Sequence, residues 1–289
     1  MQTRSGIRSD VHERTWHVFD VADVVFSLKL QSVMISVSTN GPVRCIVLDR
    51  PEKFNSFNRE MAIRLQNELD AAAADESIRA ILLSANGKAF CAGQDLSEAI
   101  APDGPGIRAI VREHYNPIIL KIRSIEKPVV CAVNGVAAGA GANIALACDL
   151  VIAGKGASFI QAFSKIGLVP DSGGTFFLPR LIGFQRAAAL MMMGDKVTAD
   201  EALAMGMIYR TVDDDRLSEE ALSIASTLGN MPTRGIGLTK RLLNRSMSNS
   251  LEQQLEAEEE HQAIAGQTLD HKEGVRAFLE KRKPEFIGK

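Results

Sequence analysis

The chain is poor in the residues that build metal sites and disulfides. It has four cysteines, Cys45, Cys91, Cys131 and Cys148, without a C-x-x-C spacing, and five histidines, of which no two are four residues apart. Because the cysteines stand among apolar neighbours, we expect reduced, buried thiols in a cytoplasmic protein. Zinc sites need clustered cysteines and histidines, so no metal site is predicted.

An excess of charge of one sign is also missing. The 289 residues carry 33 Lys+Arg against 35 Asp+Glu, a formal charge of −2, and Lys and Arg form no block. Chains that bind nucleic acid normally carry a basic patch, so we expect no nucleic-acid partner. With 46% hydrophobic residues, the chain is long and apolar enough to bury a sizeable core.

One segment is apolar enough to suggest a membrane span. Residues 128–148 are 21 positions without a charge, about the length that crosses a bilayer. Asn134, Asn143 and three glycines interrupt this segment, and its pattern changes from β-branched to Gly/Ala-rich. We therefore expect a strand, a tight turn and a buried helix here, and no membrane partner.

Apolar periodicity predicts strands that alternate with helices. Strands are expected at 33–37, 43–48, 81–83, 129–133, 150–153 and, after Gly183, only at 208–212. Helices are expected at 58–74, 107–125, 140–148, 234–247, 251–265 and 272–281. An Asn-Gly step joins the first two strands as a hairpin, and 97–106 is expected to be a long loop. The alternation indicates an α/β fold with parallel strands.

Two strands run into glycine-rich segments. These are NGKAFCAGQDL at 86–96 and NGVAAGAG at 134–141. Such segments free main-chain N–H groups, and the second opens a helix, where unpaired donors and the helix dipole favour an anion. Two donors that meet at one point would form an oxyanion hole. The equal alternative is that the glycines only let strands and helices pack closely.

Two other motifs are incomplete. The segment 139–141 lacks the third glycine of a dinucleotide-binding loop, because Ile144 stands in its place. DSGG at 171–174 is typical of the nucleophile segment of trypsin-like serine proteases, but Pro170 precedes it and the α/β pattern does not fit a double β-barrel. A serine hydrolase with Ser172 as nucleophile is therefore a weaker alternative.

Four segments, in order, resemble the crotonase (enoyl-CoA hydratase/isomerase) superfamily. They are RPEKFNSF (50–57), FCAGQDL (90–96), NGVAAGAG (134–141) and GLVPDSGG (167–174), and the similarity continues to EGVRAFLEKR (273–282). The resemblance implies a crotonase-like spiral of ββα repeats at 33–230. It also implies a helical C-terminal region at 231–289 that mediates contacts in a homotrimer or a dimer of trimers.

Residues 1–32 lie outside this resemblance. Met34 stands where chains of this family often begin. We therefore expect residues 1–32 to be an extension that is disordered or that precedes the true start of the protein.

The resemblance further implies an acyl-CoA substrate and no separate cofactor, since coenzyme A is part of the substrate. The N–H groups of Ala92 and Ala140 are expected to hold the thioester oxygen as enolate charge develops. For binding of coenzyme A and the acyl group the family pattern indicates Lys53, Phe54, Ser56, Gln94, Asp95, Leu96, Val136, Asn143, Phe163 and Lys281, the last from a neighbouring subunit. Structural hydrogen bonding is the favoured alternative for Asp95, and also for Asp149.

The chain departs from the hydratase pattern at two positions. Asn143 and Phe163 stand where hydratases of the family carry glutamates, and neither is a base at neutral pH. Asp171 instead matches the acidic residue of isomerases and of chlorobenzoyl-CoA dehalogenases in the family. Its alternative role is to cap the following helix. The pKa of Asp171 is expected to be raised by its apolar neighbours Phe163, Ile166, Leu168 and Phe176.

Within the family, the chain is most similar to the isomerases that convert ring-1,2-epoxyphenylacetyl-CoA to oxepin-CoA. The matching segments are YNP (115–117), AFSK (162–165) and FIGK (286–289). We therefore predict an acyl-CoA isomerase that uses one aspartate as proton carrier. Its substrate would be 2-(1,2-epoxy-1,2-dihydrophenyl)acetyl-CoA, an enoyl-CoA whose double bond is shifted, or both. The alternative is an enoyl-CoA hydratase of fatty-acid or aromatic-acid degradation.

Overall fold

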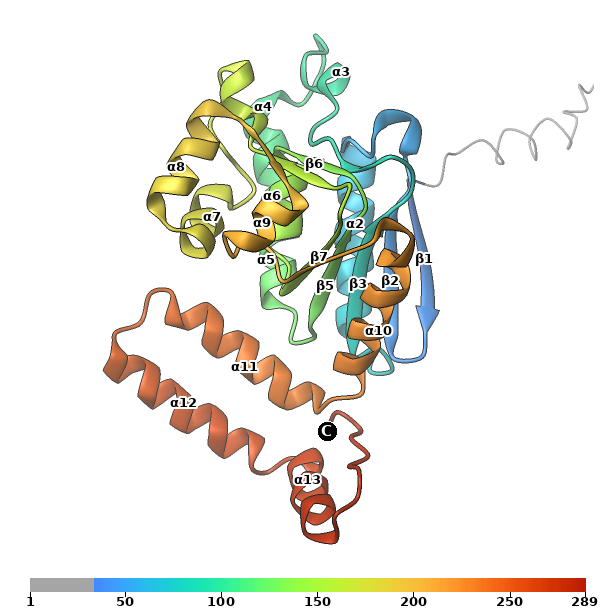
Figure 1. Ribbon diagram of the computed structural model, residues 1–289, viewed down its shortest axis with the longest axis vertical. Coiled ribbons are helices and arrows are strands. Elements are labelled where there is room, and N and C mark those ends of the chain that lie inside the picture. Colours follow the sequence, from blue (N-terminus) through green and yellow to red (C-terminus); the bar gives the residue numbers. More distant parts are fainter. Residues whose placement is uncertain (1–33) are drawn as a thin grey trace, which may run out of the picture. The chain divides into compact units, whose positions relative to one another are not determined.

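The computed structural model describes residues 34–289, which form two sheets surrounded by helices (Figure 1). The expectation for residues 1–32 lies outside the described residues. The larger sheet has the strand order β1 (Ile35–Asn40), β2 (Val43–Leu48), β3 (Ala80–Ala85), β5 (Val129–Val133), β7 (Leu150–Gly154) and β10 (Arg210–Val212). β1 and β2 form the predicted antiparallel hairpin, and all other pairs in this sheet are parallel.

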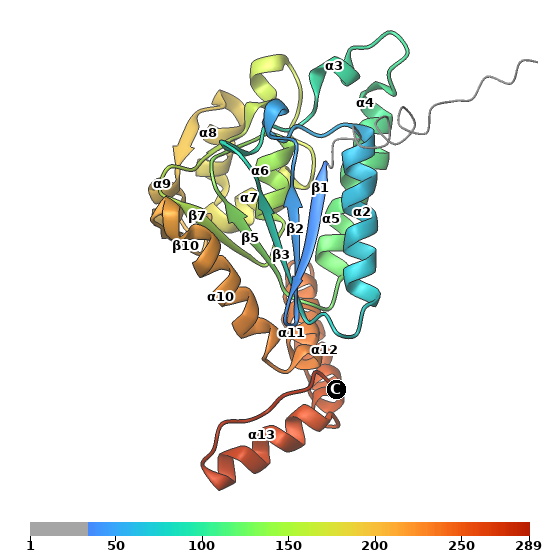
Figure 2. The same ribbon diagram turned by 90° about the vertical axis from the view of Figure 1, so that its right-hand side faces the viewer.

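Both faces of the larger sheet are buried, which explains the unbroken apolar runs in its central strands. Ala80 and Leu82 of β3 pack in one apolar cluster with α10 (Leu217–Gly229). Ile81 and Leu83 alternate with them and belong to the cluster that contains α2 (Arg59–Ala74) and α5 (Asn116–Ser124). Figure 2 shows α10 on one side of the sheet and α2 with α5 on the other.

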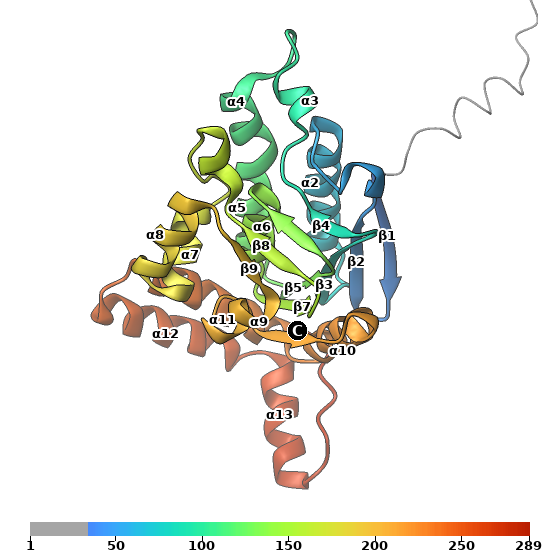
Figure 3. The same cartoon turned by 45° about the horizontal axis from the view of Figure 1, so that its top comes forward.

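A second sheet consists of three-residue strands (Figure 3). Its order is β4 (Ala89–Cys91), β6 (Val136–Ala138), β8 (Ser158–Ile160) and β9 (Lys196–Thr198). β4, β6 and β8 each follow a strand of the larger sheet within a few residues, so the chain repeats a strand–strand–helix unit. Three residues are too few for a period-two pattern to be recognised. The expectation of a single strand after Gly183 is therefore wrong, because β9 also lies there.

The helix predicted at 107–125 is helical throughout but changes its winding. It consists of α4 (Gly106–Ala109), a π-helical turn at Ile110–Tyr115 and α5. Pro117 has no N–H to donate, and the carbonyl of Glu113, four residues before it, instead accepts a hydrogen bond from Gln66 Nε2 at 2.8 Å. A proline inside the predicted helix thus explains the wider turn, and such turns are frequent at functional sites.

The segment 97–106, predicted as a loop, begins within a short helix. Asp95 caps α3 (Leu96–Ala99) by accepting a hydrogen bond from the Ser97 N–H at 3.0 Å. The helices that complete the core region are α6 (Ala140–Leu146), α7 (Gly174–Ile182), α8 (Phe184–Met193) and α9 (Ala199–Ala204), with single helical turns at Pro51–Lys53, Ala162–Ile166 and Asp214–Arg216.

Three helices follow the core region, as predicted: α11 (Thr233–Ser246), α12 (Leu251–Ala265) and α13 (Leu269–Glu280). Lys240 of α11 is only 5% exposed and donates to Asp149 Oδ2 at 2.7 Å. Asp149 also accepts hydrogen bonds from the Val129 N–H at 2.8 Å and from Arg123 at 3.0 Å. The predicted structural role of Asp149 is therefore confirmed: it joins α11 to the larger sheet and to α5.

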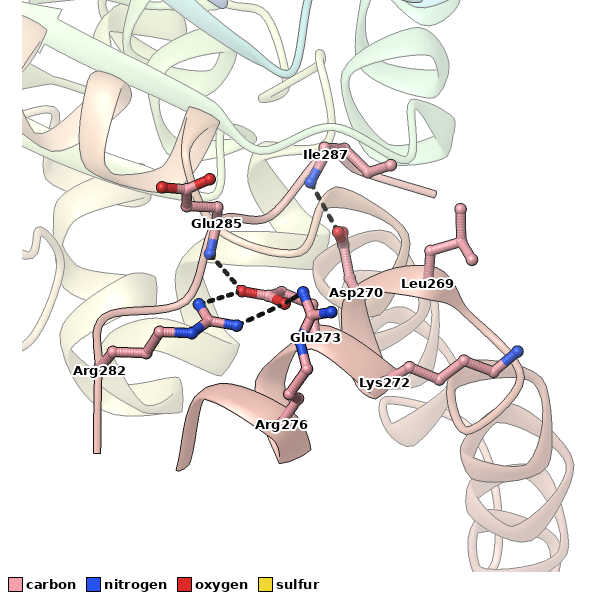
Figure 4. A pocket seen from close by; sticks show the side chains of 8 residues that line it. All are labelled: Leu269, Asp270, Lys272, Glu273, Arg276, Arg282, Glu285 and Ile287. Atoms are coloured by element: carbon pink, nitrogen blue, oxygen red, sulfur yellow. Dashed lines mark hydrogen bonds and ion pairs between the residues drawn. The ribbon is translucent and has the colours of Figure 1, made fainter. Parts of the chain in front are cut away.

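The C-terminal tail folds back along α13 (Figure 4). The carboxylate of Asp270 accepts hydrogen bonds from the N–H groups of Ile287 at 2.7 Å and Gly288 at 2.8 Å. Glu273 accepts from Arg282, from the Glu285 N–H and from Arg276, and these donors hold the pKa of Glu273 well below its usual range. The tail is thus fixed by charge-assisted hydrogen bonds rather than by apolar packing alone.

Within residues 34–289, no helix combines the length and the apolar character needed to cross a bilayer. The uncharged segment 128–148 consists of β5, β6 and α6, which confirms the expected strand, turn and buried helix and adds a short second strand. All four cysteines are free thiols. Cys91, Cys131 and Cys148 are buried as predicted, whereas Cys45 is only half-buried because it lies on the outer part of the larger sheet.

Candidate active site

A cavity of about 540 Å³ lies where the two glycine-rich segments meet the π-helical turn and the helical turn at Ala162–Ile166. Its volume is within the range of small-molecule sites. Its wall is mostly apolar, formed by Leu96, Ala99, Ile100, Ile107, Ile110, Val111, Ala162, Phe163, Ile166 and Leu168. The groups that can bond or transfer protons are contributed by main-chain atoms at 92–94 and 139–140 and by Gln94, Tyr115, Lys165 and Asp171.

Asp171 is the carboxylate of this cavity. Burial raises the pKa of Asp171, and a hydrogen bond from Ser172 opposes that rise. Three of its predicted apolar neighbours, Phe163, Ile166 and Leu168, line the cavity with it. The fourth, Phe176, is not part of this lining and lines a separate groove beside α5 and α11.

Asp171 does not cap the helix that follows it. The N-cap of α7 is Gly173, and no side chain makes a capping hydrogen bond there. The capping alternative for Asp171 is therefore wrong. Its carboxylate oxygen Oδ1 instead accepts a hydrogen bond from Ser172 Oγ at 2.7 Å.

The same hydrogen bond bears on the serine-hydrolase alternative. In a serine hydrolase the nucleophilic hydroxyl donates to a histidine. The Ser172 hydroxyl donates to a carboxylate, and no histidine within residues 34–289 is hydrogen-bonded to it. The arrangement that would activate Ser172 as a nucleophile is therefore missing.

Asn143 holds the main chain at Asp171 through a buried hydrogen bond. Its Nδ2 donates to the main-chain oxygen of Asp171 at 2.8 Å, and its Oδ1 accepts from Gln161 Nε2 at 2.8 Å. A Cβ atom on Gly174 would lie 2.4 Å from Asn143 Nδ2, so only glycine fits at that position. Asn143 is 1% exposed and does not line the cavity, which corrects its predicted contact with substrate.

Of the two predicted oxyanion donors, the N–H of Ala140 is available at the cavity and the N–H of Ala92 is not. Ala140 is the first residue of α6, where an N–H has no partner within the helix, and it lines the cavity. The N–H of Ala92 donates to the main-chain oxygen of Phe54 at 3.0 Å, so it is not free to bind a substrate. The prediction of Ala92 as a donor is therefore wrong.

Gln94 offers the free N–H that Ala92 lacks. Its backbone forms a parallel bridge with Phe57, in which Gly93 O and the Asp95 N–H bond to Phe57. Because neighbouring peptide groups in an extended chain point in opposite directions, the Gln94 N–H points away from Phe57. No acceptor for it is found within residues 34–289. A Cβ atom on Gly93 would lie 3.7 Å from the nitrogen of Ala140, so the residue before Gln94 lies beside the first residue of α6.

Tyr115 is a site residue that the sequence analysis did not select. The π-helical turn directs this side chain into the cavity wall, where it is 1% exposed and packs edge-on against Phe57. Burial raises the pKa of Tyr115, so the phenol stays protonated and donates to Gln94 Oε1 at 2.8 Å. Gln94 Nε2 in turn donates to Glu98 Oε2 at 2.9 Å. The side chain of Gln94 is thereby held at both ends.

The remaining predicted residues for coenzyme A and the acyl group divide into two sets. Gln94, Leu96 and Phe163 line the cavity with Asp171. Outside its lining lie Lys53, Phe54, Ser56, Asp95, Val136 and Lys281. Lys53 and Phe54 are exposed at the end of the helical turn Pro51–Lys53, and the carbonyl of Phe54 accepts the hydrogen bond from the Ala92 N–H. Lys281 directly follows α13. Val136 pairs within the second sheet, with Ala89 and Ser158.

Asp95 has a structural role in this chain. Its Oδ2 lies 2.8 Å from Arg50 Nη1, and its Oδ1 caps α3. Burial alone would raise the pKa of Asp95, but the hydrogen bonds from Ser97 and Arg50 outweigh burial and lower it. The alternative of structural hydrogen bonding is thus the one that the contacts of Asp95 support.

Comparison with known proteins identifies the family. Residues 38–289 match the family model of enoyl-CoA hydratase/isomerase. The 1,2-epoxyphenylacetyl-CoA isomerase of Escherichia coli K12 is 46% identical over 250 residues, which cover 86% of this chain and 95% of that protein. The 2,3-dehydroadipyl-CoA hydratase of the same organism is 33% identical over 253 residues, covering 88% and 98%.

A solved structure of the same family is also similar to this chain. The crystal structure of enoyl-CoA hydratase from Bacillus anthracis superimposes with a TM-score of 0.83 at 32% identity and covers 89% of this chain and 100% of that one. The predicted crotonase-like α/β fold and the similarity to the epoxyphenylacetyl-CoA isomerase are therefore confirmed. The chain belongs to the enoyl-CoA hydratase/isomerase family.

Proposed function

We propose that this chain is an acyl-CoA isomerase in which Asp171 carries a proton between two carbons of the substrate. The thioester oxygen would be held by the N–H groups of Gln94 and Ala140, two residues that both line the cavity. The acyl group would lie along the apolar wall of the cavity, which contains Phe163 and Ile110.

The proposed reaction balances without a second reactant. The Asp171 carboxylate takes a proton from a carbon made acidic by the thioester, and the electron pair of the broken C–H bond moves to the thioester oxygen. Two N–H donors stabilise that enolate, each donor contributing about 3 kcal/mol to transition-state stabilisation. Asp171 then returns the proton to a different carbon, and the double bond has shifted. A raised pKa suits this role, because the same group must accept and release the proton.

The observation that carries this proposal is the number of carboxylates at the cavity. In the part of the chain that the structure describes, Asp171 is the one carboxylate among the lining residues. Hydration of a double bond by two glutamates needs one to activate water and one to protonate carbon. Isomerisation needs a single proton carrier, which matches this cavity.

The test is proton exchange in D₂O. Wild-type protein is expected to exchange the acidic protons of an acyl-CoA and to shift the double bond of a 3-enoyl-CoA. Asp171→Asn should reduce both rates by about 10²- to 10⁴-fold while the circular dichroism spectrum is unchanged. Asp215→Asn, at an exposed position outside the cavity, is the matched control. Full activity of Asp171→Asn would refute the proposal.

The proposed substrate is 2-(1,2-epoxy-1,2-dihydrophenyl)acetyl-CoA. In this substrate the proton would move from the carbon beside the thioester to a ring carbon, and the bond between the two epoxide carbons would break as the ring expands to the oxepin, so no atom is gained or lost. Two observations support this substrate: the relative named 1,2-epoxyphenylacetyl-CoA isomerase is 46% identical, and the cavity wall is apolar. A panel of this epoxide and of 3-enoyl-CoAs of increasing length would rank the substrates by kcat/KM. A preference for a short aliphatic enoyl-CoA over the epoxide would reject this assignment and keep the reaction type.

Hydration of an enoyl-CoA is the second candidate. It is favoured by the relative named 2,3-dehydroadipyl-CoA hydratase, which covers nearly the same part of this chain. Formation of 3-hydroxybutyryl-CoA from crotonyl-CoA at a rate above that of double-bond migration would make hydration the main activity.

We also propose that the chain assembles as a homotrimer or a dimer of trimers through its C-terminal helices. Five large apolar side chains on α12 and α13 are more than half exposed: Leu251, Leu255, Leu269, Phe278 and Leu279. Lys281 directly follows this surface and would reach the coenzyme A of a neighbouring subunit. Light scattering after gel filtration measures the oligomer, and a monomer would contradict both parts of this proposal.

A further inference from the structure

Ser172 has an unusual backbone for its residue type. Its φ is +52°, in the left-handed region that residues other than glycine and asparagine rarely adopt. The residue is 1% exposed. Gly173, the next residue, is also left-handed, with φ +74°. Strained conformations of this kind persist where the surrounding structure enforces them, and they are concentrated at functional sites.

This backbone brings the Ser172 hydroxyl back to the carboxylate of the preceding residue. Ser172 Oγ donates to Asp171 Oδ1 at 2.7 Å. For the other carboxylate oxygen, Oδ2, the described residues provide no hydrogen-bond donor. The two oxygens of Asp171 are thus different: Oδ1 is bonded to Ser172, whereas Oδ2 has no hydrogen-bond donor among residues 34–289, and the residue lines the cavity.

Few other charged or titratable groups face this carboxylate. The π-helical turn contributes the Tyr115 phenol, and the helical turn at Ala162–Ile166 contributes the exposed Lys165 ammonium group. From α6 only Ala140 lines the cavity, and α7 contributes no lining residue. Among the described residues, Ser172 is therefore the one side chain that is hydrogen-bonded to the Asp171 carboxylate.

We propose that Ser172 is a positioning residue that holds Oδ1 of Asp171 and thereby assigns both proton transfers to Oδ2. This inference rests on the proposed role of Asp171 as proton carrier. The C–H bond of the substrate breaks as the Oδ2–H bond forms, the electron pair moves to the thioester oxygen, and the same Oδ2–H later protonates the second carbon. Because one oxygen performs both transfers, the proton stays on one face of the substrate.

The hydroxyl also favours the ionised form of Asp171. A hydrogen bond to a carboxylate stabilises its charge, so it opposes the rise in pKa that burial causes. Since the ionised carboxylate is the base, activity falls as the pH falls through the pKa of Asp171. Loss of the Ser172 hydroxyl should therefore move this acid limb to higher pH.

The experiment compares two variants that lose the hydroxyl but differ in backbone strain. In Ser172→Ala the strain remains, and in Ser172→Gly it is relieved. Both are expected to move the acid limb of kcat/KM for double-bond migration upwards by about one pH unit. Both should also increase deuterium uptake from D₂O into the migrating position, because Oδ2 is no longer fixed. Ser158→Ala removes a buried hydroxyl outside the cavity and should leave both readouts unchanged.

The outcomes separate this inference from the proposed function. If Asp171→Asn is inactive while both Ser172 variants keep the wild-type pH profile and deuterium uptake, the inference is wrong and the proposed function stands. If only Ser172→Ala differs from wild type, Ser172 has a purely structural role and the inference is again wrong. If Asp171→Asn is fully active, the proposed function is wrong, and the inference, which rests on it, is wrong as well. Equal shifts in both Ser172 variants would support the inference.

Discussion

Asn143 Nδ2 donates a hydrogen bond to the main-chain oxygen of Asp171 at 2.8 Å. Asn143 belongs to α6, whose first N–H is a proposed oxyanion donor, and Asp171 is the proposed proton carrier. The hydrogen bond therefore fixes the distance between the two halves of the site. The acceptor of the same amide, Asn143 Oδ1, accepts a hydrogen bond from Gln161 Nε2 at 2.8 Å, so both ends of the amide are bonded inside the protein.

Asn143→Ala is expected to lower both stability and activity. The variant leaves the buried Gln161 Nε2 without its acceptor and removes one of the two donors to the Asp171 main-chain oxygen, which keeps the Gly174 N–H at 2.9 Å; we expect a cost of about 1–3 kcal/mol of unfolding free energy. Isomerase activity should fall about tenfold or more, since the Asp171 segment loses its support. Urea unfolding and steady-state kinetics measure the two effects. Loss of stability without loss of activity would show that Asn143 does not position Asp171.

Ala140→Pro tests the oxyanion donor without removing a side-chain function. Proline is tolerated at the first position of a helix, and here its ring would put a Cδ methylene in place of the N–H at the cavity. We expect kcat to fall about 10²- to 10³-fold. Leu251→Pro makes the same change at the first position of α12, outside the cavity but on the proposed assembly surface, and should leave kcat unchanged when light scattering shows the wild-type oligomer. Similar kinetics for the two variants would remove Ala140 from the site.

Tyr115→Phe removes one hydroxyl from the cavity wall. The hydrogen bond to Gln94 Oε1 is lost, so the Gln94 segment is held less firmly and the rate of isomerisation should fall about tenfold. The other tyrosine of the chain, Tyr209, is half exposed and outside the cavity, and Tyr209→Phe should have wild-type kinetics. Unfolding midpoints of both variants distinguish a local effect from a loss of folding. A wild-type rate for Tyr115→Phe would mean that Gln94 needs no such anchor.

The residues of the site also show what the sequence can and cannot predict. Asp171 and Ala140 follow from the family resemblance of the segments 167–174 and 134–141, which fixes their place in the chain. The choice of Ala92 was two residues away from Gln94, because the direction of an N–H depends on strand pairing, here the bridge between Phe57 and Gln94. Tyr115 could not be selected from the sequence. The apolar spacing of its segment predicts an ordinary helix and does not reveal the π-helical turn that directs its side chain into the cavity.

The fold was predictable to a similar degree. Strands of the larger sheet, such as β5 at Val129–Val133, are buried on both faces and stand out as apolar runs. Strands of the second sheet, such as β6 at Val136–Ala138, contain too few residues for any pattern. Their hydrogen bonds are made with segments distant in the sequence, which a single sequence does not reveal.

The ion pair between Lys240 and Asp149 provides a test of how the C-terminal helices are attached. Burial lowers the pKa of Lys240. The carboxylate of Asp149, whose Oδ2 lies 2.7 Å from Lys240 Nζ, opposes this effect. Lys240→Met is expected to cost about 3 kcal/mol of unfolding free energy, the lower end for a buried pair, because Arg123 still neutralises Asp149.

The matching variants complete this test. Asp149→Asn leaves the buried ammonium group without its anion and should cost more than Lys240→Met. The double variant Lys240→Met/Asp149→Asn should be more stable than the sum of the single losses implies. Additive losses in urea unfolding would mean that the pair does not interact.

Asp171→Asn is expected to make the protein more stable at neutral pH. The pKa of Asp171 is raised by burial in the native state, so the native protein binds the proton more tightly than the unfolded chain does. Stability therefore falls as the pH rises from the unfolded pKa through the native one, by about 1.4 kcal/mol for each unit of difference. Asparagine carries no charge and avoids this cost.

The gain in unfolding free energy should consequently be largest at pH 7 and should shrink as the pH approaches 4, about the ordinary pKa of an aspartate. Urea unfolding of wild type and Asp171→Asn over that range measures it, and Asp215→Asn, at an exposed position, should show no comparable pH-dependent gain. A base that costs stability while it is ionised, and whose removal abolishes the reaction, is a residue kept for chemistry. Equal stability of the two proteins at every pH would mean that burial does not disfavour the Asp171 charge, and the carboxylate would then be too weak a base for the proposed proton transfer.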